Sequence, residues 1–178
     1  LAAEALSSPN AAECWDDMLM ATNARPGPLR GAALAALCFI DPKRAEPIVV
    51  PAIKDPDPLV RTRLCAGLAL VPGTKAFEAL AETVQDAKPE VRLAALAGLA
   101  SRGDGNGAAH AITRAGDADP QVARAAEATV VALGAKAVES LADLLKSNNT
   151  QIRYIAARGL SQSPKGVPSL IEALSDGS

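Results

Sequence analysis

One histidine and three cysteines are the residues of this chain whose types most readily do covalent or acid–base chemistry. His110 is the single imidazole, and the cysteines are Cys14, Cys38 and Cys65. A cysteine or serine nucleophile needs a base such as histidine within hydrogen-bond reach. Whether these residues can form a catalytic pair therefore depends on the elements that position them.

The sequence gives little support for a metal-binding or phosphate-binding site. There is no C-x-x-C, no H-E-x-x-H and no second histidine, so we expect neither a metal site nor a cofactor. The densest carboxylate cluster, Glu13 with Asp16 and Asp17, is more typical of a solvated helix face. The glycine-rich segment GDGNG (103–107) lacks the strand and lysine of a phosphate loop. It indicates a flexible turn, with anion binding as the lesser alternative.

A repeated apolar pattern organises the chain. The residues that close each apolar stripe recur every 31 positions, with one last step of 30: Leu6, Leu37, Leu68, Leu99, Val130 and Leu160. The residue eight positions earlier is also apolar: Leu29, Val60, Val91, Val122 and Ile152. Residues at relative positions 0, 4 and 8 share one face of a helix, so each stripe predicts an amphipathic helix, which we name helix B.

A second series of residues predicts a shorter partner, helix A: Met18, Val49, Leu80, Ala111, Leu141 and Leu170. The pairs Asp57-Pro58 and Asp119-Pro120 are typical of helix starts, since aspartate caps the first turn and proline tolerates the first helical position. The sequence therefore predicts alternating A and B helices.

We expect one array over residues 1–178, cut from a longer solenoid. In this interpretation residues 1–8 end a truncated helix B, and residues 164–178 form a lone final helix A. The hairpin units between them are residues 9–40, 41–71, 72–102, 103–133 and 134–163. The exposed apolar ends of such a slice favour end-to-end self-association.

The repeat unit, a helical hairpin carrying D-x-D-P-x-V-R-x-x-A, resembles the short bacterial HEAT repeat, also called HEAT-like or bilin-lyase type. DPDPLVRTRL (55–64) and DAKPEVRLAA (86–95) carry the resemblance most clearly, and it covers essentially the whole chain. It implies an all-α, right-handed α-solenoid of antiparallel helical hairpins. Relatives include scaffolds, bilin-attachment lyases, DNA-repair proteins and a hydroxylase whose His-Glu iron ligands have no match here, so the fold leaves the function open.

The resemblance also implies a structural ladder between neighbouring repeats, formed by aspartate and arginine six residues apart. The matches are Asp55 with Arg61 and Asp86 with Arg92. Three other units depart from the pattern at one member: Ala123 replaces arginine, and Ala24 and Ser147 replace aspartate before Arg30 and Arg153. We interpret the ladder as complete in two units and broken in three, and as holding turns rather than binding a ligand.

In such an array the cysteines lie two or three repeats before His110. We therefore expect an exposed polar histidine near the end of a short helix and no Cys–His pair. Cys38 and Cys65 fall on adjacent B helices, where two buried thiols are favoured over a disulfide.

The amino-acid composition limits which partners and which cellular compartment we expect for this chain. Hydrophobic residues make up 49% of the 178 residues and aromatic ones only 2%, so the core must consist of small aliphatic side chains. The formal charge of −2 gives no electrostatic reason to expect nucleic acid or an anionic membrane as partner. An odd number of cysteines and no visible export signal favour the cytoplasm, although a signal already removed would leave the same sequence.

The B helices present a second face, opposite the one that meets helix A, which we expect to line a concave groove. Its floor would be Leu93 and Val131, edged by the residues Thr62, Arg124, Tyr154 and Arg158. Glu127, three residues after Arg124, is expected to pair with it across a helical turn. The alternative is that curvature closes the groove and neighbouring helices cover its many alanines.

An apolar surface edged by tyrosine and arginine is typical of protein recognition. The sequence therefore predicts a non-enzymatic scaffold or adaptor that binds a partner helix or peptide on the helix-B face. The alternative is a bilin-lyase-type subunit that handles a chromophore.

Overall fold

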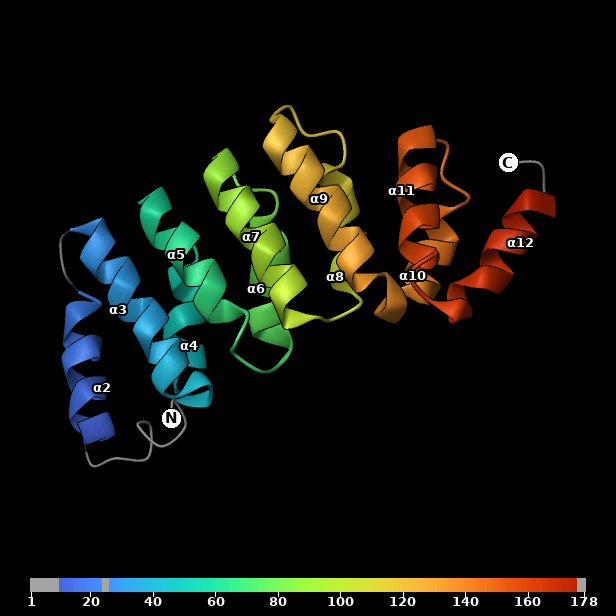
Figure 1. The fold of residues 1–178 in the computed structure, drawn as a ribbon. Helices are drawn as coiled ribbons and strands as arrows, with labels where there is room; N and C mark the ends of the chain where they lie inside the picture. The colour runs from blue at the N-terminus through green and yellow to red at the C-terminus, as the bar shows by residue number, and fades with distance from the viewer. Residues whose placement is uncertain (1–9, 24–25, 176–178) are drawn as a thin grey trace. The chain divides into compact units, whose positions relative to one another are not determined.

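The computed structural model describes residues 10–23 and 26–175, so the predicted segment 1–8 lies outside the described residues. The fold is an all-α solenoid of antiparallel helical hairpins. Its α-helices are α2 (Asn10–Ala21), α3 (Gly27–Ile40), α4 (Pro42–Ala52), α5 (Pro58–Leu68), α6 (Thr74–Thr83), α7 (Pro89–Arg102), α8 (Gly107–Ala111), α9 (Pro120–Leu133), α10 (Val138–Leu144), α11 (Thr150–Leu160) and α12 (Val167–Ser175) (Figure 1). Short 3-10 turns are η1 (Ile112–Arg114), η2 (Gly134–Lys136) and η3 (Pro164–Gly166).

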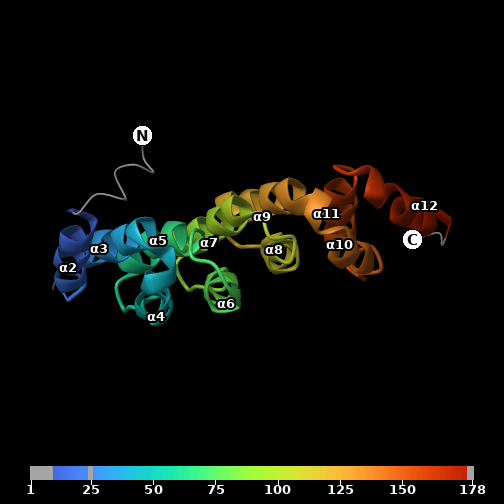
Figure 2. The same cartoon turned by 90° about the horizontal axis from the view of Figure 1, so that it is seen from below.

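The chain divides into two compact parts, unit 1 (residues 1–98) and unit 2 (residues 99–178), with the boundary inside α7. In unit 1, α3, α5 and the start of α7 form one layer, and α4 and α6 form the other (Figure 2). In unit 2, α9 and α11 form one layer, and α8 and α10 the other (Figure 2). The helices α3, α5, α7, α9 and α11 correspond to the predicted B helices. The grouping of the hairpins into the predicted repeat units stays a prediction.

The predicted apolar face of each B helix forms the core. On α5, Val60, Leu64 and Leu68 are fully buried, and on α9 Val122, Ala126 and Val130 are as well. Leu29, placed on this face by the repeat spacing, is half exposed instead. Two residues later α3 packs closely against α5 at Gly31, where an added Cβ would press on the Cα of Val60.

Side-chain caps fix where the B helices begin. Asp57 accepts a hydrogen bond from the backbone N–H of Leu59 at 2.9 Å, and Asp119 accepts one from Gln121 at 2.8 Å. Asn149 takes the same role for α11 by accepting from Gln151 at 2.9 Å. Each cap satisfies an N–H that the first helical turn leaves without a partner, so the starts of these helices are specified locally.

Unit 2 contains close backbone approaches that only glycine permits. A Cβ at Gly134 would collide with the carbonyl group of Gly159, which belongs to α11. The backbone just after α9 therefore meets the backbone near the end of α11. Within the part of the chain that the structure describes, no helix is long and apolar enough to cross a membrane.

Candidate functional site

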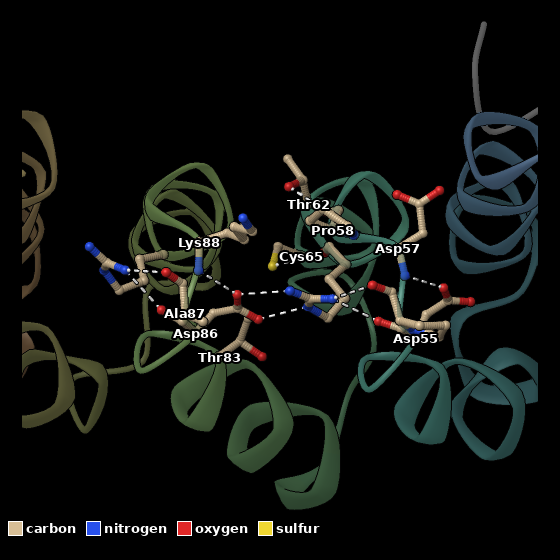
Figure 3. A network of polar contacts seen from close by, with 12 residues as sticks. Asp55, Asp57, Pro58, Thr62, Cys65, Thr83, Asp86, Ala87 and Lys88 are labelled. Carbon is tan, nitrogen blue, oxygen red and sulfur yellow. Dashed lines mark hydrogen bonds and ion pairs between the residues drawn. The ribbon is translucent and has the colours of Figure 1, made fainter.

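The arginine–aspartate ladder of unit 1 lies in the turns that lead into the B helices. Arg61 of α5 donates from Nε and Nη2 to the two carboxylate oxygens of Asp86, at 2.7 and 2.9 Å. Arg30 of α3 does the same to Asp55, at 2.7 and 2.8 Å. Figure 3 shows the turns of Asp55 and Asp86, with Asp86 facing the helix that carries Thr62 and Cys65. Each bidentate pair thus joins one B helix to the turn before the next.

This geometry corrects two sequence-based expectations. Aspartate and arginine six residues apart are joined through the main chain: Arg61 Nη1 donates to the carbonyl of Asp55 at 2.8 Å, and Arg92 Nη1 to that of Asp86 at 2.9 Å. The carboxylate itself is bound by the arginine of the preceding hairpin. Arg30, expected to stand where the ladder is broken, therefore holds Asp55, because its partner follows it in the sequence.

The ion pairs set the acidity of both carboxyls. Hydrogen bonding from Arg30, the largest influence, holds the pKa of Asp55 below its usual value although partial burial opposes this. Partial burial is the largest influence on Asp86 and raises its pKa, but the hydrogen bonds from Arg61 and the N–H of Lys88, with nearby positive charge, lower it overall. Both carboxylates stay ionised with their oxygens already bonded, an arrangement suited to holding turns.

The corresponding positions of α9 and α11 in unit 2 differ in composition. Ala123 stands where α5 has Arg61, and Ser147 stands where the next turn has Asp86. Arg153 still donates to the carbonyl of Ser147 at 2.8 Å, as Arg61 does to Asp55. The main-chain part of the ladder is thus kept between the Ser147 turn and α11, while Ala123 and Ser147 cannot form the bidentate pair.

The helix-B face of unit 1 is largely small and apolar. We define this face as the side of the B helices opposite helix A. Ala66 and Ala97 are exposed on it, and Leu93 is half buried. Thr62 is half buried too, and its hydroxyl donates to the carbonyl of Pro58 at 2.8 Å. Cys38 of α3, expected as a buried thiol, is fully buried.

The helix-B face of unit 2 carries charge and an aromatic ring beside exposed Ala128 and half-buried Val131. Arg158 forms an ion pair with Glu127, and its guanidinium lies 5.8 Å from the centre of the Tyr154 ring. This corrects the expected pairing of Glu127 with Arg124, and the exposed Arg124 donates instead to the carbonyl of Pro120 at 3.2 Å.

The ion pair and the ring contact have a direct consequence for this surface. Arg158 receives support from two sides, since Glu127 belongs to α9 and Tyr154 lies one turn before it on α11. Tyr154 nevertheless remains half exposed. The side chains Tyr154 and Arg158 are therefore positioned in advance while still open to solvent.

A groove of about 590 Å³ opens beside this cluster in unit 2, between α11 and α12. It is lined by Leu145, Thr150, Arg153, Tyr154, Ala157, Arg158, Ser161, Leu170, Ala173 and Leu174. The sequence reasoning placed Tyr154 and Arg158 on a binding surface but missed Arg153 and Leu174 as part of one. The helix-A spacing carried a signal, since Leu174 occupies the register of Leu145 and Val84, which are buried.

The structure shows the surroundings of the four residues first considered for catalysis, His110 and the three cysteines. His110 is exposed at the surface of α8, Cys14 is exposed, and Cys38 and Cys65 are free and buried. Burial raises the pKa of both Cys38 and Cys65 to about 12, so both remain protonated thiols near neutral pH. Over residues 10–23 and 26–175 no group of three or more acidic, histidine or cysteine side chains could hold a metal ion.

Comparison with models of protein families shows which family this chain matches. A model of HEAT repeats matches residues 18–100 and 52–132, which together span more than half of the chain. The chain belongs to the HEAT-repeat family. This agrees with the paired layers of each unit and with the side-chain caps at the starts of α5, α9 and α11. A search of the curated proteins finds no match.

Solved structures share this fold at low sequence identity. The complex of CpcE and CpcF of phycocyanin lyase from Nostoc sp. aligns with a TM-score of 0.59 at 18% identity, covering 85% of this chain and 65% of that one. Two engineered proteins align with TM-scores of 0.54 and 0.57, at 16% and 18% identity. They cover 90% and 93% of this chain, and 85% and 51% of their own. Likenesses at this identity concern the HEAT-repeat fold alone.

Proposed function

We propose that this HEAT-repeat protein is a non-catalytic scaffold that binds a partner helix or peptide on its helix-B face. The observation that carries the proposal is an exposed alanine at the same position of three B helices: Ala66 and Ala97 in unit 1, and Ala128 in unit 2. A surface without long side chains lets a partner backbone approach closely, and an exposed apolar strip gains free energy when a partner covers it.

Unit 2 supplies the residue types that anchor such a partner. Tyrosine and arginine carry a large share of binding energy at protein interfaces, and Tyr154 and Arg158 are held in place by Glu127 and by each other. Because these side chains are already ordered, binding costs less conformational entropy than ordering two free side chains would. Arg124 and Val131 extend the proposed contact along α9.

Unit 1 contributes the more apolar part of the face. Leu93 and Thr62 flank the exposed Ala66 and Ala97, and we expect them to form the floor beneath a partner rather than its main anchor, because they are half buried. Their partial burial also decides which residues to change in a test. Glutamate at Leu93 or Val131 would disturb packing as well as binding, whereas glutamate at an exposed alanine leaves the core intact.

The test is a set of capture experiments from lysate of the source organism, with bound proteins identified by mass spectrometry. The baits are the native chain, Ala97→Glu in unit 1, Ala128→Glu in unit 2, and a control, Ala109→Glu, at an exposed position on α8. The proposal expects a protein retained by the native chain and the control and lost by Ala97→Glu, Ala128→Glu or both. Equal retention by all four baits would contradict it.

The competing function is a chromophore-handling subunit like the bilin lyases. Its support is the repeat type, together with the fold shared with the phycocyanin lyase complex. This alternative predicts that a linear tetrapyrrole added to the native chain changes its absorbance spectrum, with less change for Ala128→Glu than for Ala109→Glu. The scaffold proposal predicts no spectral change for any of the three proteins.

A further inference from the structure

Helix α12 exposes an apolar stripe, and the repeat register places one of its residues, Leu174, in the core. Val167, Ile171 and Leu174 lie at spacings of four and three, so they share one side of the helix. Leu174 is 80% exposed, whereas Leu145, its equivalent in the preceding hairpin, is 6% exposed. Leu145 is covered because α11 packs back against α10. The stripe on α12 is therefore shaped to be covered by a helix.

Two arginine side chains line the groove between α11 and α12 beside this stripe. They are Arg153 and Arg158; no carboxylate lines the groove, but Arg158 already forms an ion pair with Glu127 of α9. Arg153 donates to uncharged acceptors, the carbonyl of Ser147 and the hydroxyl of Thr150. A helix that fills the groove would thus meet apolar side chains along α12 and guanidinium groups along α11, which favours an occupant with both apolar and acidic residues.

Helix α2 has this combination. Asp16, Asp17 and Met20 lie at spacings of one, three and four and are all exposed, with Met20 at 68%. Leu19, beside them, is partly exposed as well. The sequence of α2, NAAECWDDMLMA, contains no basic residue. Its outward face is therefore acidic and ends in a long, flexible apolar side chain, the complement of the groove in both respects.

We propose that two copies of this chain associate head to tail, with α2 of one copy seated in the α11–α12 groove of the other. Asp16 and Asp17 face Arg153 and Arg158, and Met20 covers Ile171 and Leu174. Such a contact joins two different surfaces, so copies add to one another head to tail, as open chains or as closed rings. It shares Arg158 with the proposed scaffold function, but it does not use the exposed alanines of the helix-B face.

The first part of the test is sedimentation velocity of the native chain at low salt over a wide range of concentrations. The proposal expects the average mass to rise with concentration above the monomer mass of 18.1 kDa. It also expects salt to reduce the mass, because the charge pairs are at the surface and are screened. A chain that remains monomeric over the whole range would overturn the proposal.

The second part uses two complementary variants. The groove variant, Ile171→Glu with Leu174→Glu, and the helix variant, Asp16→Lys with Asp17→Lys, each change only exposed side chains. Circular dichroism checks that both stay folded. Each variant alone is expected to be monomeric, because one side of the contact is lost. Their mixture restores one intact groove and one intact α2, so it should form a one-to-one complex and no larger species.

The control is Phe39→Glu, which places a carboxylate at another exposed apolar site and should associate like the native chain. Failure of the two variants to combine would overturn the head-to-tail contact, as would association that persists in either variant alone. Capture of a partner on the helix-B face is measured separately with Ala97→Glu and Ala128→Glu, so failure of one proposal leaves the other standing.

Discussion

In unit 1 and in unit 2, an ion pair links neighbouring hairpins, but the ion pair lies in a different place in each unit. In unit 1, Arg61 of α5 reaches across the turn to Asp86 at 2.7 Å and joins successive hairpins there. Between α9 and α11 of unit 2 both members of that pair are replaced, by Ala123 and Ser147. The helices are joined instead by Glu127 and Arg158, on the helix-B face.

HEAT hairpins can therefore be joined to their neighbours by ion pairs at different positions, either in the turns or on the helix-B face. In the turns, the arginine is largely enclosed and serves the fold. On the helix-B face, Arg158 remains about half exposed, so the same kind of ion pair holds a side chain that solvent can still reach. The ion pairs of unit 1 are enclosed in the turns, whereas that of unit 2 lies where the proposed partner would bind.

The largest effect is expected where the backbone leaves no room. Gly134→Ala places a Cβ against the carbonyl group of Gly159, which cannot rotate away, so we expect a loss of about 3 kcal/mol in the free energy of unfolding. Gly67→Ala in unit 1 meets mainly the Cys38 side chain and should cost less. Gly116→Ala, with nothing near its Cβ, is the control. Urea unfolding measures all three, and equal losses would contradict the argument.

The next prediction compares the ion pair of Arg61 in the turns with the ion pair of Arg158 on the helix-B face. Arg61→Ala removes a well-enclosed bidentate pair and should cost about 1–3 kcal/mol, whereas Arg158→Ala removes an exposed one and should cost about 0–1 kcal/mol. Arg61→Lys should fall between native and Arg61→Ala, because lysine keeps the charge but not the two parallel hydrogen bonds. Lys75→Ala, a charge removed from an exposed site, is the control. A larger loss for Arg158→Ala than for Arg61→Ala would refute the distinction.

A third effect follows from the lowered pKa values of Asp55 and Asp86. A carboxyl whose folded pKa is lower than its unfolded pKa stabilises the fold above the unfolded value, about 3.9. That stability is lost as the pH falls through the folded pKa. We therefore expect the difference in stability between native protein and Asp86→Asn to shrink as the pH is lowered below about 4. A difference that is constant from neutral to acidic pH would show that the ion pair contributes nothing.

The smallest effect concerns local opening, which is measured by the reactivity of the cysteines. All three cysteines lie in unit 1, where Cys14 is exposed and Cys38 and Cys65 are buried with a pKa of about 12. A thiol reagent at neutral pH should label Cys14 rapidly and the other two slowly. Arg61→Ala should speed the slow labelling because it loosens unit 1, and Arg158→Ala should not. Identical acceleration by both would mean that the two links act on the whole chain alike.

The fold could be predicted because the repeat signals are local. The stripe of Val60, Leu64 and Leu68 and the caps at Asp57 and Asp119 depend on residues within one helix, so one sequence contains them. Leu29 shows where this ends, because the repeat spacing places it on the apolar stripe and it is nevertheless half exposed. Close approaches between helices, such as that of α3 and α5 at Gly31, leave no periodic signal.

The candidate site was harder to predict for the same reason. Residues three apart on a helix are neighbours by geometry, which led to the pairing of Arg124 with Glu127. The partner that Glu127 takes, Arg158, comes from another helix, and only the packed structure brings the two together. The same holds for Arg30 with Asp55. The groove beside α12 appears only once α11 and α12 are placed in three dimensions.

The central claim, that the helix-B face binds protein, is tested most directly by one titration. The partner captured by the native chain is purified, and its dissociation constant is measured for the native chain, Ala128→Glu and the α8 control Ala109→Glu. The account predicts at least about tenfold weaker binding for Ala128→Glu, or about 1.4 kcal/mol, and no change for the control. Equal affinity for all three proteins would contradict the claim and exclude α9 from the binding surface.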